Sequence, residues 1–226
     1  MSNTNKFYPY TTNGGLTLGL TTGQPFALLA ADTRSTTDYS INTRTDRKIF
    51  TLQPDTASPI LLSVIGFAAD GHALHDRLAI QTEMYRYRHG RPMSVAACAQ
   101  RVATLLYEKR FFPYHLQTMV AGLDDVGVGA VYCFDPAGSC ERTESCVGGG
   151  AGSVAGAVLD ALLSSSSSSA SLGGGGGLDR DRAEGLVLDV FRSVAERCIE
   201  VGDYLQVVVV SRDGGVEERV FGLRKD

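Results

Sequence analysis

Asp32 and Lys48 have the side chains needed to support catalysis by a terminal amine. Asp32 follows the apolar run 26–31, and Lys48 comes sixteen residues later. A lysine near a free α-amine raises the local positive potential, so the amine stays neutral enough to accept a proton from a hydroxyl nucleophile. An aspartate would hold that lysine in place. Taken alone, an aspartate and a lysine at this spacing form a structural ion pair more often than a catalytic one.

Two other patterns could carry chemistry, and each has a simpler explanation. His72 and His75, with Asp70 and Asp76, could place metal ligands on adjacent turns of a helix. No third ligand cluster accompanies them, and a helix start with polar caps explains them better, so we expect no metal and no cofactor. The glycines at 148–152 precede a helix as in phosphate-binding loops, but the G-K-[ST] signature is absent. Tight packing of a turn on a sheet is the better explanation.

The segment 110–114 reads Arg-Phe-Phe-Pro-Tyr and places aromatic residues beside a base. Such residues could stack on nucleic acid bases. No basic surface surrounds the segment, so the sequence favours a contact with another subunit or a buried turn.

Composition narrows the possible partners and the compartment. A net charge of −4 and a pI near 5.6 argue against nucleic acid or an anionic membrane as the main partner. No apolar stretch approaches the roughly 20 residues that span a bilayer, and the first six residues contain no apolar core of a secretory signal. The odd number of cysteines without a C-x-x-C pair favours reduced thiols, and hence the cytoplasm or nucleus. These are Cys98, Cys133, Cys140, Cys146 and Cys198.

Apolar patterns predict the elements that must position these residues. Leucines alternate over 16–20, as in a half-buried strand, and the runs 26–31 and 60–65 are typical of buried strands. Helical spacing follows over 74–85 and 95–106, with a stop at 90–92. The remaining expected elements are strands at 117–122 and 129–134, helical faces at 154–162 and 187–198, and a hairpin of 205–210 with 216–221.

The order of these elements predicts the fold class. Strands do not alternate singly with helices, so a parallel doubly wound sheet is disfavoured. We expect an α+β fold, a four-layer αββα sandwich of two antiparallel sheets, forming one domain over residues 1–226. The Ser/Gly-rich insertion 164–177 should be a flexible surface loop, and a neutral insertion is favoured over a phosphorylated regulatory tract.

Several motifs in order and at matching spacing give the chain its resemblance to a known family. They include the segments 14–20, 30–34, 66–70 and 148–153. The chain thereby resembles the beta subunits of the proteasome core over nearly its whole length, the Ser/Gly-rich insertion excepted. It is most similar to the sixth beta subunit of the eukaryotic core, on the segments 110–114, 122–124, 129–139, 195–197 and 223–226. The resemblance implies the N-terminal nucleophile (Ntn) hydrolase form of the αββα fold.

The resemblance also implies that the catalytic set is incomplete. Active members begin, after processing, with a threonine where this chain has Gly15, so residues 1–14 correspond to a short N-terminal extension. Gly149 stands where active members place a serine that assists the terminal amine. Cys198 and Val201 stand where they have a supporting aspartate and serine.

Three positions of the family site are retained, namely Asp32, Lys48 and Gly66, whose amide faces the oxyanion in active relatives. Without a nucleophile, a positioned base and an oxyanion donor have nothing to activate. The chain should therefore be inactive, and the retained charged residues should form a structural ion pair.

The resemblance implies a structural role in a seven-membered beta ring that is stacked against a second beta ring and an alpha ring. Such a subunit contributes to assembly and to the chamber in which ubiquitin-marked proteins are degraded. In the sixth-subunit branch, the turn corresponding to Asp124 and Asp125 reaches the substrate pocket of the neighbouring chymotrypsin-like subunit. These two carboxylates are therefore candidates for tuning specificity there.

Two alternatives stay open at the level of sequence. A working threonine protease could use a different processed N-terminus, Thr12 or Thr17, although neither has the register relative to Lys48 that Gly15 has. A self-assembling ring of one subunit type is disfavoured by the missing nucleophile.

Overall fold

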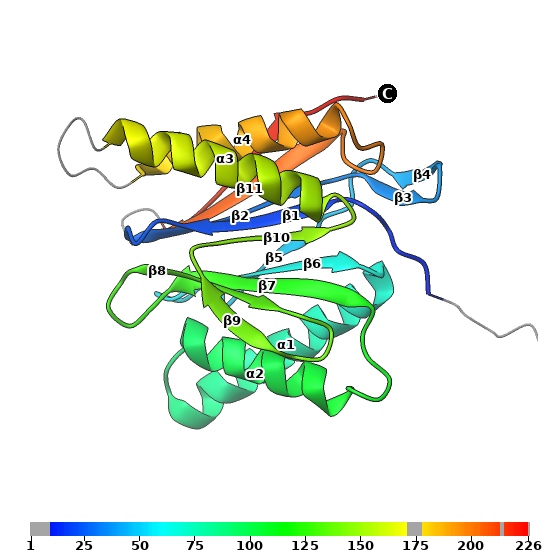
Figure 1. The fold of residues 1–226 in the computed structure, drawn as a ribbon. Helices are drawn as coiled ribbons and strands as arrows, with labels where there is room; N and C mark the ends of the chain where they lie inside the picture. The colour runs from blue at the N-terminus through cyan, green and yellow to red at the C-terminus, as the bar shows by residue number, and fades with distance from the viewer. Residues whose placement is uncertain (1–9, 171–177, 213–214, 226) are drawn as a thin grey trace, which may run out of the picture.

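The computed structural model, which describes residues 10–170, 178–212 and 215–225, has four layers (Figure 1). Two five-stranded sheets lie face to face, and all neighbouring strands in them are antiparallel. Helices α3 and α4 cover the outer face of one sheet, and α1 and α2 cover the outer face of the other (Figure 1). The chain thus has the predicted αββα sandwich of an α+β fold.

Each sheet combines strands from distant parts of the chain. The first sheet has the order β10 (Ser145–Gly149), β1 (Leu16–Thr21), β2 (Phe26–Asp32), β11 (Tyr204–Ser211) and β12 (Gly215–Gly222). The second has the order β5 (Ile49–Leu52), β6 (Ile60–Gly66), β7 (Leu116–Leu123), β8 (Gly129–Phe134) and β9 (Cys140–Thr143). A separate ribbon consists of β3 (Ser35–Thr37) and β4 (Ser40–Thr43). The helices are α1 (Ala68–His89), α2 (Val95–Glu108), α3 (Gly152–Ala170) and α4 (Arg180–Ala195).

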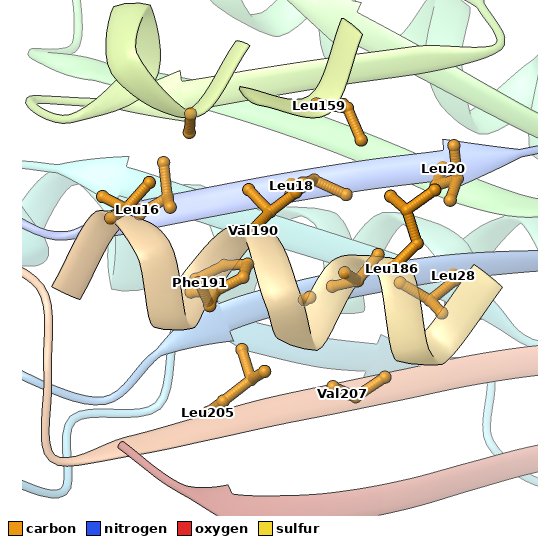
Figure 2. Packing of buried hydrophobic residues seen from close by; sticks show 14 of the residues in the cluster. Leu16, Leu18, Leu20, Leu28, Leu159, Leu186, Val190, Phe191, Leu205 and Val207 are labelled. Carbon is orange, nitrogen blue, oxygen red and sulfur yellow. The ribbon is translucent and has the colours of Figure 1, made fainter. Parts of the chain in front are cut away.

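The alternation of leucines in β1 directs one face of the first sheet toward its helices. Leu16, Leu18 and Leu20 are buried against α3 and α4 in one apolar cluster. Phe191 of α4 is fully buried in the same cluster, where Figure 2 shows it over the strands. Burying one such side chain stabilises the fold by roughly 1.5–3 kcal/mol.

Strand β2 is buried on both faces, as its continuous apolar run predicts. Leu28 faces the helix layer, whereas Ala27, Leu29 and Ala31 lie in the cluster between the two sheets. This inner cluster also contains Leu61 of the second sheet. A shared core therefore joins the two sheets and fixes the edges on which the candidate site residues lie.

The Ser/Gly-rich insertion differs from its prediction. Helix α3 continues to Ala170, so residues 164–170 are helical rather than part of a loop, and residues 171–177 lie outside the described residues. The hydroxyl of Ser164 donates to the carbonyl of Asp160 (2.7 Å), and that of Ser165 donates to the carbonyl of Leu162 (2.8 Å). Bonds of this kind satisfy serine hydroxyls within a helix, so a serine run extends α3 without burying apolar surface.

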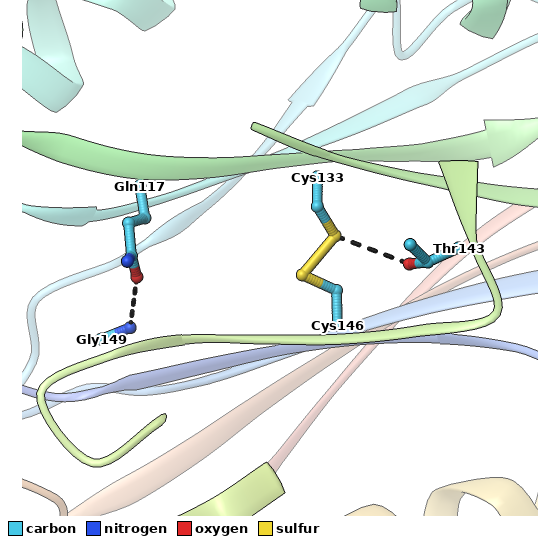
Figure 3. Close-up of a disulfide and its surroundings, with 5 residues drawn as sticks. All are labelled: Gln117, Cys133, Thr143, Cys146 and Gly149. Atoms are coloured by element: carbon cyan, nitrogen blue, oxygen red, sulfur yellow. Dashed lines mark hydrogen bonds between the residues drawn. A yellow bond between two sulfur atoms is a disulfide. The ribbon is translucent and has the colours of Figure 1, made fainter. Parts of the chain in front are cut away.

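The prediction that all cysteines are reduced is wrong for one pair. Cys133 of β8 and Cys146 of β10 form a disulfide that connects the two sheets (Figure 3). Both side chains point into the space between the sheets, next to the inner cluster. Only the packing of one sheet on the other brings them together, and no short-range sequence pattern records it. Cys98, Cys140 and Cys198 are free thiols.

Candidate functional site

The aspartate and lysine singled out by sequence form a buried ion pair. Asp32 ends β2, and Lys48 directly precedes β5. The Nζ atom of Lys48 is 2.7 Å from Oδ1 of Asp32 and also donates to the carbonyl of Arg34 at 2.7 Å. The backbone N–H of Leu16 donates to the same Oδ1 atom at 2.8 Å. The exposed fractions are 0% for Asp32 and 4% for Lys48, so solvent does not reach this pair.

Burial and charge act in opposite directions on Asp32. Removal from water raises the pKa of its carboxyl, whereas the Lys48 ammonium and the hydrogen bonds from Lys48 and Leu16 lower it, and burial is the larger effect. A buried carboxylate is tolerated when a cation and further donors surround it. The pair therefore ties the start of β1 to the end of β2 and to the segment before β5.

A side chain at Gly15, where the resemblance places the nucleophile, would meet the ion pair. Its φ angle is +90°, in the region that favours glycine. A Cβ atom at this residue would overlap Nζ of Lys48 and would lie 2.6 Å from Oδ1 of Asp32. The ion pair therefore fills the volume into which a nucleophilic side chain would project.

Gly149 is closed to a side chain in the same way. It ends β10, pairs with Leu16 and has a φ angle of +108°. Its N–H donates to Oε1 of Gln117 at 2.8 Å (Figure 3). A Cβ atom would overlap the carbonyl oxygen of Gly15 and lie 2.6 Å from Cδ1 of Ile65. The backbone here packs directly on the Gly15 backbone, at the position where the resemblance implies a serine in active members.

Residues 10–14, which we call the N-terminal strap, lead into the site and bond to the segments on either side of it. Asn13 is held from two sides, since its N–H donates to the carbonyl of Gly66 (2.9 Å) and its own carbonyl accepts from the N–H of Thr36 (2.9 Å). Its side-chain oxygen accepts from the N–H of Ala68 (2.9 Å). The retained Gly66 is therefore bonded to the strap.

An aromatic contact fixes the far end of the strap. Tyr10 stacks on His115 with ring centroids 4.0 Å apart, and its edge meets Phe67 at 5.5 Å. Sequence reasoning missed the strap, because no periodic or motif signal marks residues that bond to two separate segments. The strap leads directly into Gly15.

Cys198 and Val201 lie in the segment after α4, beside the strap. The carbonyl of the intervening Ile199 accepts from Nη1 of Arg34 (2.9 Å). The backbone carbonyl of Arg34 in turn accepts from Nζ of Lys48. Val201 is buried in the apolar cluster between the first sheet and helices α3 and α4. Cys198 is partly buried, and burial, together with the charge of Glu200, raises the pKa of its thiol. Val201 therefore contributes to packing, at a position where the resemblance implies a polar residue in active members.

A second buried charge cluster, centred on Asp203, was missed by sequence reasoning. Nε of Arg34 lies 2.8 Å from Oδ2 of Asp203, and Nη1 of Arg44 bonds to the other carboxylate oxygen. Burial raises the pKa of Asp203, but the two guanidinium groups outweigh it and hold the pKa below its usual value. The N–H of Asp203 also binds the carbonyl of Arg224, which anchors the C-terminal segment.

The two aspartates of the β7–β8 turn have different environments. Oδ1 of Asp124 accepts from the N–H groups of Val126 (3.1 Å) and Val128 (2.9 Å), and Oδ2 accepts from Arg142 (2.9 Å). The bond from Val128 and the contact with Arg142 lower the pKa of Asp124. Asp125 and Val126 form the exposed tip of the turn.

The two histidines considered as metal ligands pack on an aromatic ring. His72 and His75 lie 5.6 Å and 4.5 Å from the ring centroid of Phe50. Within residues 10–170, 178–212 and 215–225, no group of three or more His, Cys, Asp or Glu side chains is placed to hold a metal ion. Every helix in the same ranges is too short or too polar to cross a lipid bilayer.

Comparisons with known proteins agree with this geometry. A family model described as "Proteasome subunit" matches residues 11–210. The chain is 50% identical to proteasome subunit beta inpE of Emericella nidulans over 226 residues, which is 100% of both chains. It is 41% identical to proteasome subunit beta type-6 of Saccharomyces cerevisiae, covering 98% of this chain and 92% of that one. Identity to proteasome subunit beta type-1 of Drosophila melanogaster is 36%, over 97% and 91% of the two chains.

Proposed function

Because this chain belongs to the proteasome subunit family, as one of its beta subunits, we propose that it is a non-catalytic subunit of the 20S core. The observation that carries the proposal is the closed volume at Gly15, which Lys48 and Asp32 occupy. Threonine-type catalysis needs a hydroxyl and a free amine on one residue. Gly15 supplies no hydroxyl, whether or not the residues before it are removed.

The retained residues then act as structural groups. Asp32 and Lys48 join β1, β2 and the segment before β5. The carbonyl of Gly66 binds the strap through Asn13. These bonds hold the strands of the sandwich together. They can therefore support a subunit that contributes structure to the ring and carries out no acyl transfer.

The two alternative nucleophiles do not fit the site. Thr17 is buried within β1 and pairs with Ala31 and Gly148, so an N-terminus at this residue would remove the beginning of a central strand. Thr12 belongs to the strap and is exposed, on the far side of Asn13 from the ion pair. Neither residue has the place beside Lys48 that Gly15 has.

The proposed surroundings are those of a heteromeric ring. Head-to-tail contacts that close by rotation generate rings, and each subunit then needs two different complementary surfaces. We place this chain in a seven-membered beta ring, stacked on a second beta ring and on an alpha ring. Its work is to form part of the chamber wall.

A finer part of the proposal concerns the β7–β8 turn. The carboxylate of Asp124 is used within its own turn, whereas Asp125 is exposed beside Val126. We therefore assign any contact with the substrate pocket of a neighbouring chymotrypsin-like subunit to Asp125, with Asp124 shaping the turn that presents it.

Particle composition tests the structural role. Core particles are purified from the source organism through an affinity tag on an alpha subunit, and peptides of this chain are quantified against those of the other beta subunits. We expect this chain in a constant ratio to its ring neighbours. Its absence from assembled particles, or its recovery only as a homo-oligomer, would contradict the proposal.

A further inference from the structure

The end of α2 carries a group of side chains that we call the aromatic knob, consisting of Tyr107, Arg110, Phe111 and Phe112. The exposed fractions of its three rings are 58%, 90% and 69% in chain order. Sequence alone left a subunit contact and a buried turn as explanations of this segment, and the exposure excludes the buried turn. Each exposed ring keeps apolar surface in water that a partner could bury.

Backbone hydrogen bonds and contacts of Arg110 with two rings hold the knob together. The N–H of Arg110 binds the carbonyl of Tyr107 (3.0 Å), and the N–H of Phe112 binds that of Lys109 (2.9 Å), so the backbone continues in tight turns. The guanidinium of Arg110 lies 5.2 Å from the ring centroid of Tyr107 and 4.8 Å from that of Phe111. Its Nη1 atom also donates to Oη of Tyr107 at 2.6 Å. Arg110 therefore contacts two of the three rings in the absence of a partner.

This composition and order are those of a protein interface. Tyrosine, phenylalanine and arginine are enriched in interface cores, and a few such residues carry most of the binding energy. Preordered side chains also lose less entropy on binding. Pro113 and Tyr114, which follow the knob directly, line an open cavity of about 450 Å³ together with Thr12 of the strap. A partner could therefore contact both the projecting rings of the knob and the cavity beside them.

We infer that the aromatic knob docks into an apolar socket with carboxylates on its rim, on a neighbouring subunit of the core particle; this rests on the proposed function. The positive charge of Arg110 is the reason for expecting carboxylates on the rim of the socket. Glu108 is paired with Arg77 at 2.7 Å, so Arg110 is the charge of the knob itself, and the Lys109 ammonium lies nearby, 4.5 Å from the Tyr114 ring centroid. The chain as a whole carries −4, so the knob is a local exception.

Paired variants test the inference. Phe111→Ser with Phe112→Ser removes the two outer rings, and Tyr87→Ser is the matched control. Tyr87 is 83% exposed on α1, with Arg86 5.6 Å from its ring centroid. Each variant is co-expressed with the wild-type chain, and the ratio of the two chains in purified core particles is measured. We expect the knob variant to fall about tenfold or more, in the range of interface hot spots, and the control to stay near the wild-type ratio.

Thermal unfolding separates docking from folding. The knob rings are exposed, so the double variant should unfold within a few degrees of the wild-type chain. A variant that folds normally and incorporates as well as the wild-type chain overturns the inference. If the wild-type chain itself is absent from particles, the proposed function fails instead.

A photo-crosslinking phenylalanine analogue in place of Phe111 identifies the socket. In purified particles we expect one crosslink, to another proteasome subunit, at an apolar segment that contains Asp or Glu. A crosslink to RNA, or to a second copy of this chain, overturns the inference.

Discussion

The backbone of Gly15 lies so close to the ammonium group of Lys48 that a Cβ atom on the glycine would overlap Nζ. The lysine cannot simply withdraw, because it bonds to Asp32 and to the carbonyl of Arg34. A side chain at residue 15 would therefore have to displace the ammonium group from its present place beside Asp32. The packing around Gly15 and the missing hydroxyl both support the proposal that this chain is inactive.

Restoring a side chain at residue 15 should destabilise the chain without creating activity. Gly15→Ala adds backbone strain and displaces the ion pair, so we expect a loss of about 2–4 kcal/mol in the free energy of unfolding. Gly23→Ala is the matched control, since Gly23 also has a positive φ angle (+72°) but open space around its Cβ position. Its cost should be about 1–2 kcal/mol, from the backbone alone. Urea unfolding measures both, and equal losses would contradict the packing argument.

Acid should weaken the fold through Asp203. The folded-state pKa of this carboxyl is lowered, so its contribution is fully present above the ordinary value of 3.8 and is lost as the pH falls through the folded pKa. Asp203→Asn leaves Arg34 buried without its anion, at a cost of about 3–5 kcal/mol near neutral pH. The difference in unfolding free energy between wild type and variant should shrink below pH 3.8. A difference that is independent of pH would contradict this role.

The β7–β8 turn should divide its two functions between its aspartates. In assembled particles, Asp125→Asn should change cleavage after large apolar residues by about two- to fivefold, the range of an exposed charge interaction. The other peptidase activities should stay the same. Asp124→Ala removes the acceptor of the Val126 and Val128 N–H groups and should lower the melting temperature of the chain. If Asp125→Asn leaves the peptide cleavage profile unchanged, Asp125 does not contact the substrate pocket of the neighbouring subunit.

The disulfide predicts a linked peptide pair. Tryptic mapping without reductant should recover Cys133 joined to Cys146, with Cys140 alkylated as a free thiol. For a loop of this size, replacing both bridged cysteines by serine should cost about 3 kcal/mol of unfolding free energy under oxidising conditions and much less in reductant. Alkylation of both Cys133 and Cys146 in the native chain would show that the bond does not form.

The order of the main elements could be predicted from sequence because their apolar patterns are strong and local. The stripe through Leu74 and Leu78 and the continuous run of β2 each record burial on particular faces. Asp32 and Lys48 could be identified because they flank such runs. The helical serines after Leu163 could not, because their hydroxyls bond within the helix and leave no apolar signal.

The remainder of the site depends on segments that meet only after folding. Strand β9 is largely exposed and polar, so pairing with β8 defines it. The Asp203 cluster unites residues 34, 44 and 203, and no spacing rule connects them. The strap is held by backbone groups of Thr36, Gly66 and Ala68, and the side-chain types of these residues give no sign of those bonds in the sequence.

The central claim is that this beta subunit has no nucleophile, and one measurement addresses it directly. Assembled core particles are treated with a threonine-directed covalent inhibitor, and the intact mass of every subunit is determined. We predict that the catalytic beta subunits gain the mass of the inhibitor while this chain keeps its own, with Asn13 and Gly14 still preceding Gly15. An inhibitor adduct on this chain, or a mature N-terminus at Thr12 or Thr17, would contradict the account.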